Sequence, residues 1–167
     1  MTFHIGESFI GSGVNAAHIN TVYGHRDGPA GVAWASALAT PSQGHVPFVV
    51  VLQPSLPVKP MTLFVTKAAA ASDLHGNLIW GAAQAGVAGG VADAVAAGDI
   101  PSETVDEFAI ICAVWVNPQA DDEQAVFDNN RRATAEALSN GVKNLPRLED
   151  VLNNRSRPFN PFFAAKE

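Results

Sequence analysis

The sequence predicts one mixed α/β domain, in which a sheet of mixed strand direction is packed by helices. The chain has 167 residues, the usual size of a single domain, and 47% of them are hydrophobic. Segments with a two-residue period alternate with segments that carry helix caps and helix breakers. We expect residues 1–141 to form the body of the domain, and residues 142–167, rich in Asn, Arg, Pro and Phe, to form an irregular tail of the same domain.

Two strands are predicted at the start of the chain. Residues 2–10 are rich in β-branched and aromatic side chains, and the glycines of residues 11–13 break the pattern. Residues 16–23 have a period of two, which places His18 and Asn20 on the same face of their strand.

A helix and two strands are predicted next. Pro29 suits a first helical turn, and the small residues of 30–39 continue it as a helix. Residues 46–53 predict a buried strand and residues 61–67 a second strand, and the two could form a hairpin.

Two long helices and a central strand complete the predicted body. Ser72 can cap a long helix that runs to Ala97. The continuous apolar run 108–116 is typical of a strand in the middle of a sheet. Residues 121–140 predict the second long helix, with Gly141 as its stop.

Charge and hydropathy exclude several classes of partner. The chain has 16 acidic and 10 basic residues, and the basic residues form no stripe that could neutralise phosphates, so we expect no nucleic-acid partner. Fully apolar runs such as residues 48–52 are far shorter than the roughly 20 residues of a membrane span. No charged region followed by an apolar stretch precedes the first strand, and we expect a cytoplasmic protein. Charged residues make up only 16% of the chain, which favours a homo-oligomer.

His18 is the first candidate for chemistry, because histidine changes its charge near neutral pH. A histidine that only makes structural hydrogen bonds is the alternative. Lys67 ends an apolar strand and Gln84 lies in a helix of small residues, so both polar groups must find partners. A solvated lysine and an amide that packs between helices are the alternatives for these two.

No metal site is predicted. The five histidines form neither an H-x-H nor an H-x-x-x-H pair, and the single cysteine is distant from them in sequence. That cysteine, Cys112, lies in the apolar run 108–116 and is predicted to be a core residue.

Four stretches of the chain resemble the formaldehyde-activating enzyme family in the same order and with nearly the same spacing. They are residues 11–19, 56–60, 80–88 and 93–101. Several separated motifs in register are much more specific than any one of them. The similarity spans roughly residues 5–141.

The resemblance implies an enzyme that condenses formaldehyde with the reduced pterin tetrahydromethanopterin to methylene-tetrahydromethanopterin and water. It implies a ribosomal protein S5 domain 2-like fold, a homopentamer, no metal and no permanently bound cofactor, with tetrahydromethanopterin as co-substrate. The family's proton donor corresponds to His18. A pterin nitrogen adds to formaldehyde, and the resulting hydroxymethyl group must be protonated before it leaves as water.

The family's pterin pocket corresponds to five further positions in this chain: Asn20, Val49, Lys67, Ala69 and Gln84. Lys67 and Gln84 are unchanged, and Val49 is a conservative replacement. The family has aspartate at the position of Asn20 and threonine at that of Ala69. A neutral carboxamide cannot support an imidazolium as a carboxylate does, so we expect His18 to be a weaker proton carrier here.

Three functional hypotheses follow. The first is the family's condensation of formaldehyde with a reduced pterin. The second is a paralogue that acts on another aldehyde or another amine carrier, which the changes at Asn20 and Ala69 would accompany. The third is a non-catalytic oligomer that binds a pterin or an aldehyde.

Overall fold

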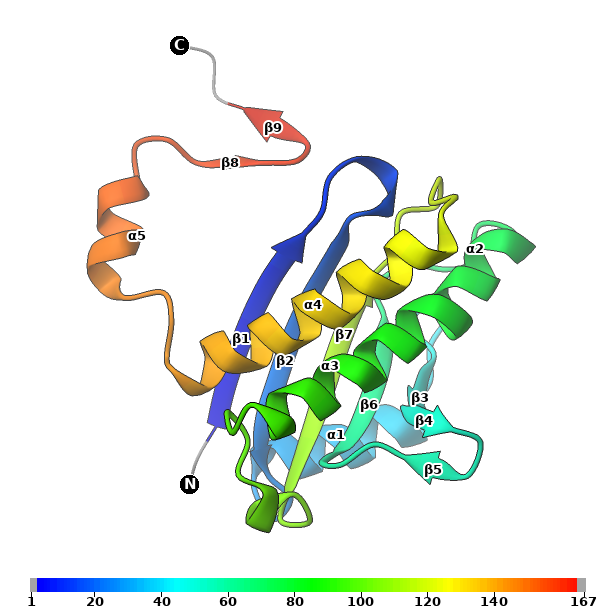
Figure 1. Ribbon diagram of the computed structural model, residues 1–167, viewed down its shortest axis with the longest axis vertical. Coiled ribbons are helices and arrows are strands. Elements are labelled where there is room, and N and C mark those ends of the chain that lie inside the picture. The colour runs from blue at the N-terminus through cyan, green and yellow to red at the C-terminus, as the bar shows by residue number, and fades with distance from the viewer. Residues whose placement is uncertain (1–2, 165–167) are drawn as a thin grey trace.

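A five-stranded sheet with the order β1-β2-β7-β6-β3 forms the centre of the computed structural model, which describes residues 3–164 (Figure 1). Its strands are β1 (Phe3–Ile10), β2 (Ala17–His25), β7 (Phe108–Trp115), β6 (Met61–Thr66) and β3 (Pro47–Val49). Only the pair β6–β7 is parallel, and the other three pairs are antiparallel. The predicted mixed sheet is therefore confirmed, with the apolar strand β7 at its centre.

Two long helices cover one face of this sheet, α3 (Gln84–Ala96) and α4 (Glu123–Val142), and they lie side by side in Figure 1. They approach closely because glycines line their contact: a Cβ atom on Gly90 would lie 2.5 Å from the backbone oxygen of Arg131. The small residues of this helix thus serve helix packing.

The helix α3 continues a helical run that starts at α2 (Asp73–Asn77) and passes through a π-helical stretch, Leu78–Ala83. Ser72 caps the run as predicted, since its side chain accepts a hydrogen bond from the backbone N–H of His75. This run, Asp73–Ala96, is long and apolar enough to cross a membrane by length and composition. In the most apolar 18-residue segment of this run, 61% is buried inside the domain, as in the core helix of a globular fold.

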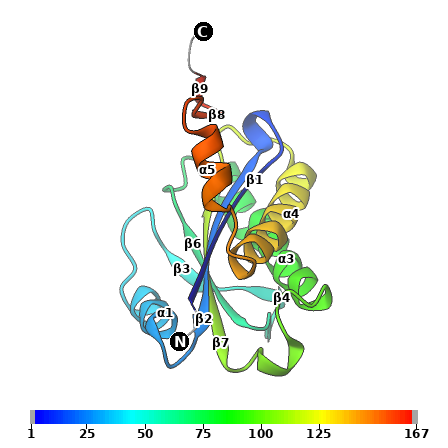
Figure 2. The same ribbon diagram turned by 90° about the vertical axis from the view of Figure 1, so that its left-hand side faces the viewer.

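The opposite face of the sheet is only half covered. Helix α1 (Pro29–Ala39) lies over the ends of β2 and β7 on this side, as the edge-on view of Figure 2 shows. Strand β2 alternates between the two faces as predicted: Ile19 and Thr21 are buried under the helices, whereas His18 and Asn20 are half-buried on the open side.

The prediction of one buried strand over residues 46–53 is wrong. The main sheet ends at Val49, and after the buried Val50 the residues of β4 (Val51–Gln53) pair with β5 (Leu56–Pro57) in a separate small sheet. The expected hairpin partner of β6 is β3, and the two strands are antiparallel.

The predicted stop at Gly141 is also wrong, because α4 continues to Val142. Gly141 is buried in the last turn of α4, where an added Cβ would lie 3.1 Å from the backbone nitrogen of Gly6. The glycine therefore lets the helix approach β1.

The tail is more ordered than predicted. It contains helix α5 (Leu148–Asn154) and a hairpin of β8 (Phe159–Asn160) and β9 (Phe163–Ala164). Figure 1 shows the hairpin of β8 and β9 near the end of the sheet at which β1 turns into β2, and α5 to the side of β1. Short 3-10 turns at Gly13–Asn15 and Ser102–Thr104 complete the described elements.

Candidate active site

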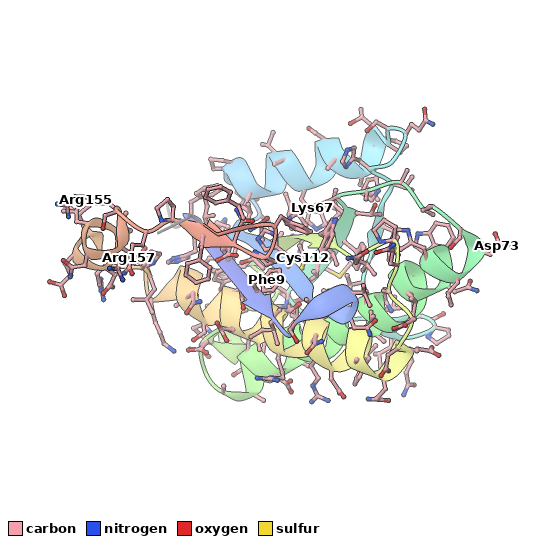
Figure 3. All side chains as sticks on the ribbon, turned by 90° about the horizontal axis from the view of Figure 1, so that it is seen from above. Phe9, Lys67, Asp73, Cys112, Arg155 and Arg157 are labelled. Atoms are coloured by element: carbon pink, nitrogen blue, oxygen red, sulfur yellow. The ribbon has the colours of Figure 1, made fainter. Side chains whose placement is uncertain are left out.

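A groove of about 990 Å³ opens on the half-covered face, between the end of the sheet and the tail. Its charged and ionisable side chains are Glu7, His18 and Lys67. Its aromatic lining comes from Phe9 on β1, Trp115 on β7, and Phe159 and Phe162 in the tail. Figure 3 looks down on this end of the molecule, with Phe9 and Lys67 labelled beside the tail strands.

Strand pairing brings the residues of the groove together. His18 lies opposite Phe9 of β1 on one side and opposite Trp115 of β7 on the other. Because directly paired residues project to the same face of a sheet, all three side chains are on the open side. The rings of Phe9 and His18 have centroids 5.9 Å apart.

His18 has a carboxylate partner from the neighbouring strand. Its Nε2 atom lies 3.0 Å from Oε1 of Glu7 on β1, and the histidine side chain is 37% exposed. Sequence reasoning missed Glu7, because only the register of β1 on β2 shows which residue faces the histidine. The alternation along β1 was a usable signal, since it places Glu7 and Phe9 on the same face.

Lys67 and Asn20 meet across the central strand. The Nζ atom of Lys67 donates a hydrogen bond to Oδ1 of Asn20, and both side chains are half-buried. Asn20 pairs with Ala113 of β7, and the backbone N–H of Lys67 donates to the carbonyl oxygen of Val114 on the same strand, so the two side chains meet diagonally across β7. Burial lowers the pKa of Lys67, and the negative charge of Glu7 opposes this effect.

Val49 and Gln84 lie apart from His18, in a smaller hollow of about 300 Å³ at the β3 edge of the sheet. The Oε1 atom of Gln84 accepts the backbone N–H of Val51 at 2.7 Å, so this amide fastens the helix to β4. Within one chain, His18 and Lys67 therefore line one hollow, and Val49 and Gln84 line another.

Ala69 is exposed in the loop that follows β6. Its backbone nitrogen lies 3.3 Å from the position that a Cβ on Gly44 would take, so the loop packs against the turn before β3. Ala69 lines neither the His18 groove nor the smaller hollow.

The other histidines contrast with His18. His75 is buried, with Nδ1 accepting the backbone N–H of Ala71 at 3.0 Å and Nε2 lying 3.0 Å from the carbonyl oxygen of Val116. Both its nitrogens are thus committed to structure. His25 lies at the far end of β2 beside Glu107, in a separate hollow of about 550 Å³ under α1.

Residues 3–164 contain no group of three or more histidine, cysteine, aspartate and glutamate side chains placed to hold a metal ion. Cys112 is buried in the core as predicted, and this burial raises the pKa of its thiol to about 12.

Known proteins are similar in sequence to nearly the whole chain. The sequence profile of the family described as formaldehyde-activating enzyme (Fae) matches residues 5–163. This match extends past Gly141 and includes most of the tail.

Named relatives agree with the profile. The 5,6,7,8-tetrahydromethanopterin hydro-lyase of Methanosarcina barkeri is 38% identical over 158 residues, which are 95% of this chain and 89% of the relative. The bifunctional enzyme Fae/Hps of Archaeoglobus fulgidus is 41% identical over 167 residues, but the chain spans only 42% of its length. That of Methanothrix thermoacetophila is 38% identical, with 95% of this chain and 41% of the relative covered. The family profile covers nearly the whole chain, and the chain covers 89% of the hydro-lyase of Methanosarcina barkeri. The chain therefore belongs to the formaldehyde-activating enzyme family.

Proposed function

We propose that this chain catalyses the condensation of formaldehyde with tetrahydromethanopterin to methylene-tetrahydromethanopterin and water. The observation that carries the proposal is the meeting of His18 and Lys67 in one aromatic-lined groove of a member of this family. The groove of about 990 Å³ is at the upper end of the usual size of small-molecule sites.

In the proposed reaction His18 acts as a general acid. One pterin nitrogen attacks the carbon of formaldehyde and its proton passes to the former carbonyl oxygen, which leaves a hydroxymethyl group on that nitrogen. The imidazolium of His18 protonates the hydroxyl oxygen, the carbon–oxygen bond breaks and water leaves. A second pterin nitrogen then attacks the same carbon, and the proton it releases restores the acid. Proton balance is thereby complete, and the net products are the methylene bridge and one water.

The other groups of the groove suit a flat, polar heterocycle. Trp115 and Phe162 pack edge to face, with centroids 5.8 Å apart, and the ring of Phe159 is 82% exposed. Exposed aromatic faces can stack on a pterin ring. The ammonium group of Lys67 can donate hydrogen bonds to the oxygen or nitrogen atoms at the edge of that ring.

We further propose a homopentamer that acts in the cytoplasm. Many large apolar side chains of the single chain are exposed, among them Val32 on α1 at 67% and Phe162 in the tail at 77%. Surfaces of this kind mark contacts with other chains. A pterin held between two subunits would touch the His18 groove of one and the Val49–Gln84 hollow of the next, so that both groups would form one site. The single unpaired thiol of Cys112 fits a reducing compartment.

The test is the rate of methylene-tetrahydromethanopterin formation with and without the protein, measured above the spontaneous reaction. We expect acceleration by the wild-type protein and its loss in His18→Ala. His25→Ala is the matched control, because His25 is on the same strand and its side chain is equally exposed, at 37%. Absence of acceleration by the folded wild-type protein would refute the proposed function.

A second candidate function is motivated by the partner of Lys67, which is the neutral amide of Asn20 and not a carboxylate. With no carboxylate at residue 20, the pocket suits a paralogue that uses another aldehyde or amine carrier, or an oligomer that only binds such a ligand. Turnover with a different carrier, and no gain from Asn20→Asp with tetrahydromethanopterin, would favour the paralogue. Calorimetry that detects pterin binding without turnover would favour the binding protein.

A further inference from the structure

We propose that Glu7 is a positioning residue for His18, which holds the imidazole with a proton on Nε2 and leaves Nδ1 to exchange the catalytic proton. This inference deepens the proposed function and rests on it. Its basis is the 3.0 Å contact between Oε1 of Glu7 and Nε2 of His18.

The chemistry of the two groups assigns the tautomer. An ionised carboxylate oxygen has lone pairs and no hydrogen atom, so at 3.0 Å it repels a ring nitrogen that also has a lone pair and favours the tautomer with a hydrogen atom on Nε2. In the neutral ring the lone pair is then on Nδ1. In the part of the chain that the structure describes, Nε2 has this partner, and Nδ1 makes no hydrogen bond to the protein. Nδ1 is thus the nitrogen that can take up a proton and give it to a hydroxyl group.

The surroundings favour this pairing over the alternatives. The charged and ionisable groups that line the groove around His18 are Glu7 from β1 and Lys67 from the end of β6. The ammonium of Lys67 is bonded to Asn20, so it does not take the carboxylate away from the histidine. The neighbour of His18 on β7 is the uncharged Trp115.

The pairing of β1 with β2 also places a carboxylate opposite residue 20, where β2 itself has no acidic side chain. Glu7 lies directly opposite Asn20 in the pairing of β1 with β2, and it reaches diagonally to His18. The negative charge that was expected at residue 20 is therefore supplied from the adjacent strand, two residues before Phe9. The expectation that His18 is a weaker proton carrier was drawn from β2 alone, and it stays a prediction.

The experiment compares Glu7→Ala, which removes the acceptor, with Glu7→Gln, which keeps an acceptor oxygen without the charge. Nitrogen-15 NMR of the His18 ring in the free protein reports the tautomer. We expect one Nε2–H tautomer in the wild type and in Glu7→Gln, and a mixture in Glu7→Ala. Steady-state kinetics should show kcat reduced about tenfold or more in Glu7→Ala, with KM for the pterin unchanged, and a smaller loss in Glu7→Gln.

Glu107→Gln is the matched control, because Glu107 is 61% exposed beside His25, as Glu7 is 59% exposed beside His18. We expect it to leave the tautomer of His18 and kcat unchanged. A single Nε2–H tautomer in Glu7→Ala, or unchanged kcat in that variant, would overturn the inference. The NMR measurement needs no turnover, so an inactive wild-type protein would refute the proposed function while the pairing of Glu7 with His18 is still tested.

Discussion

Lys67 reaches diagonally across strand β7 and donates a hydrogen bond from Nζ to Oδ1 of Asn20. The partner of this half-buried cation is a neutral amide, so its positive charge is not cancelled by an ion pair with that partner. The charge remains available to a ligand in the groove, at the cost of partial desolvation that lowers the pKa of Lys67.

The first prediction is that Asn20→Asp extends activity to higher pH. A lysine whose pKa is lowered loses its charge at a lower pH than an exposed lysine, so a step that needs the ammonium fails earlier on the alkaline side. An aspartate beside Nζ would raise the pKa of Lys67. The alkaline limb of the pH–rate profile should therefore move upward.

Asn153→Asp is the control for this variant, since it adds the same charge on the exposed surface of α5. It should leave the alkaline limb unchanged. An alkaline limb that moves equally in both variants, or in neither, would contradict a role for the Lys67 charge.

The second prediction concerns the anchor between the helix and β4. Gln84→Leu removes the acceptor of the Val51 N–H, which now bonds at 2.7 Å. Leaving such a donor without a partner costs about 1–3 kcal/mol of the free energy of unfolding. Urea denaturation measures the loss, and hydrogen exchange at the Val51 amide should become faster. Gln124→Leu, on the exposed side of α4, should change neither quantity appreciably.

The third prediction contrasts two glycines of the same helical run. In Gly90→Ala the new Cβ would lie 2.5 Å from the Arg131 oxygen and 2.7 Å from Cβ of Thr134, so α3 and α4 must separate. Overpacking of this kind costs about 1–3 kcal/mol. In Gly81→Ala the new Cβ meets nothing within 4 Å, and the gain in helix propensity is about 1 kcal/mol. Thermal unfolding should show shifts of opposite sign, and equal shifts would exclude close packing as the reason for Gly90.

The fourth prediction is that Cys112 does not react in the folded protein. Burial raises the pKa of its thiol to about 12, and the Thr134 hydroxyl only partly offsets this effect. Since the thiolate is the reactive form, iodoacetamide at pH 8 should modify Cys112 only after denaturation. Ser12→Cys adds an exposed thiol in the turn after β1 and serves as the positive control. Rapid modification of Cys112 in the native wild type would show that the core opens readily.

Local patterns predicted those parts of the fold that local forces determine. The period of two placed His18 and Asn20 on one face of β2, and the unbroken apolar run predicted the central strand β7. The cap at Ser72 was predictable for the same reason, because its hydrogen bond spans only three residues.

Features that depend on distant contacts were not predictable in this way. Residues 47–49, before Val50, pair with β6. Val51, after it, donates its backbone N–H to the side chain of Gln84, which is distant in sequence. Gly141 looked like a helix stop, but its small size serves the contact with Gly6 on β1. Helix α5 had a usable signal in Asp150, whose side chain accepts the backbone N–H of Arg147, and this signal was overlooked.

The residues of the candidate site were also predicted only in part. His18, Asn20 and Lys67 come together as neighbours in the sheet, whereas Val49 and Gln84 lie in another hollow of the same chain. Glu7 was not predicted, because the register between two strands determines which residues lie opposite each other. The sequence of one strand alone does not show that register.

Helix α1 has no charged residue, and Ala30 is its only buried one in the single chain. In the homopentamer proposed above, contacts between subunits would cover the exposed side of α1 and add to the free energy of unfolding of the assembled protein. Folding and assembly are then linked by mass action. The midpoint of thermal unfolding should rise with protein concentration, and dilution alone should loosen α1 before the sheet opens.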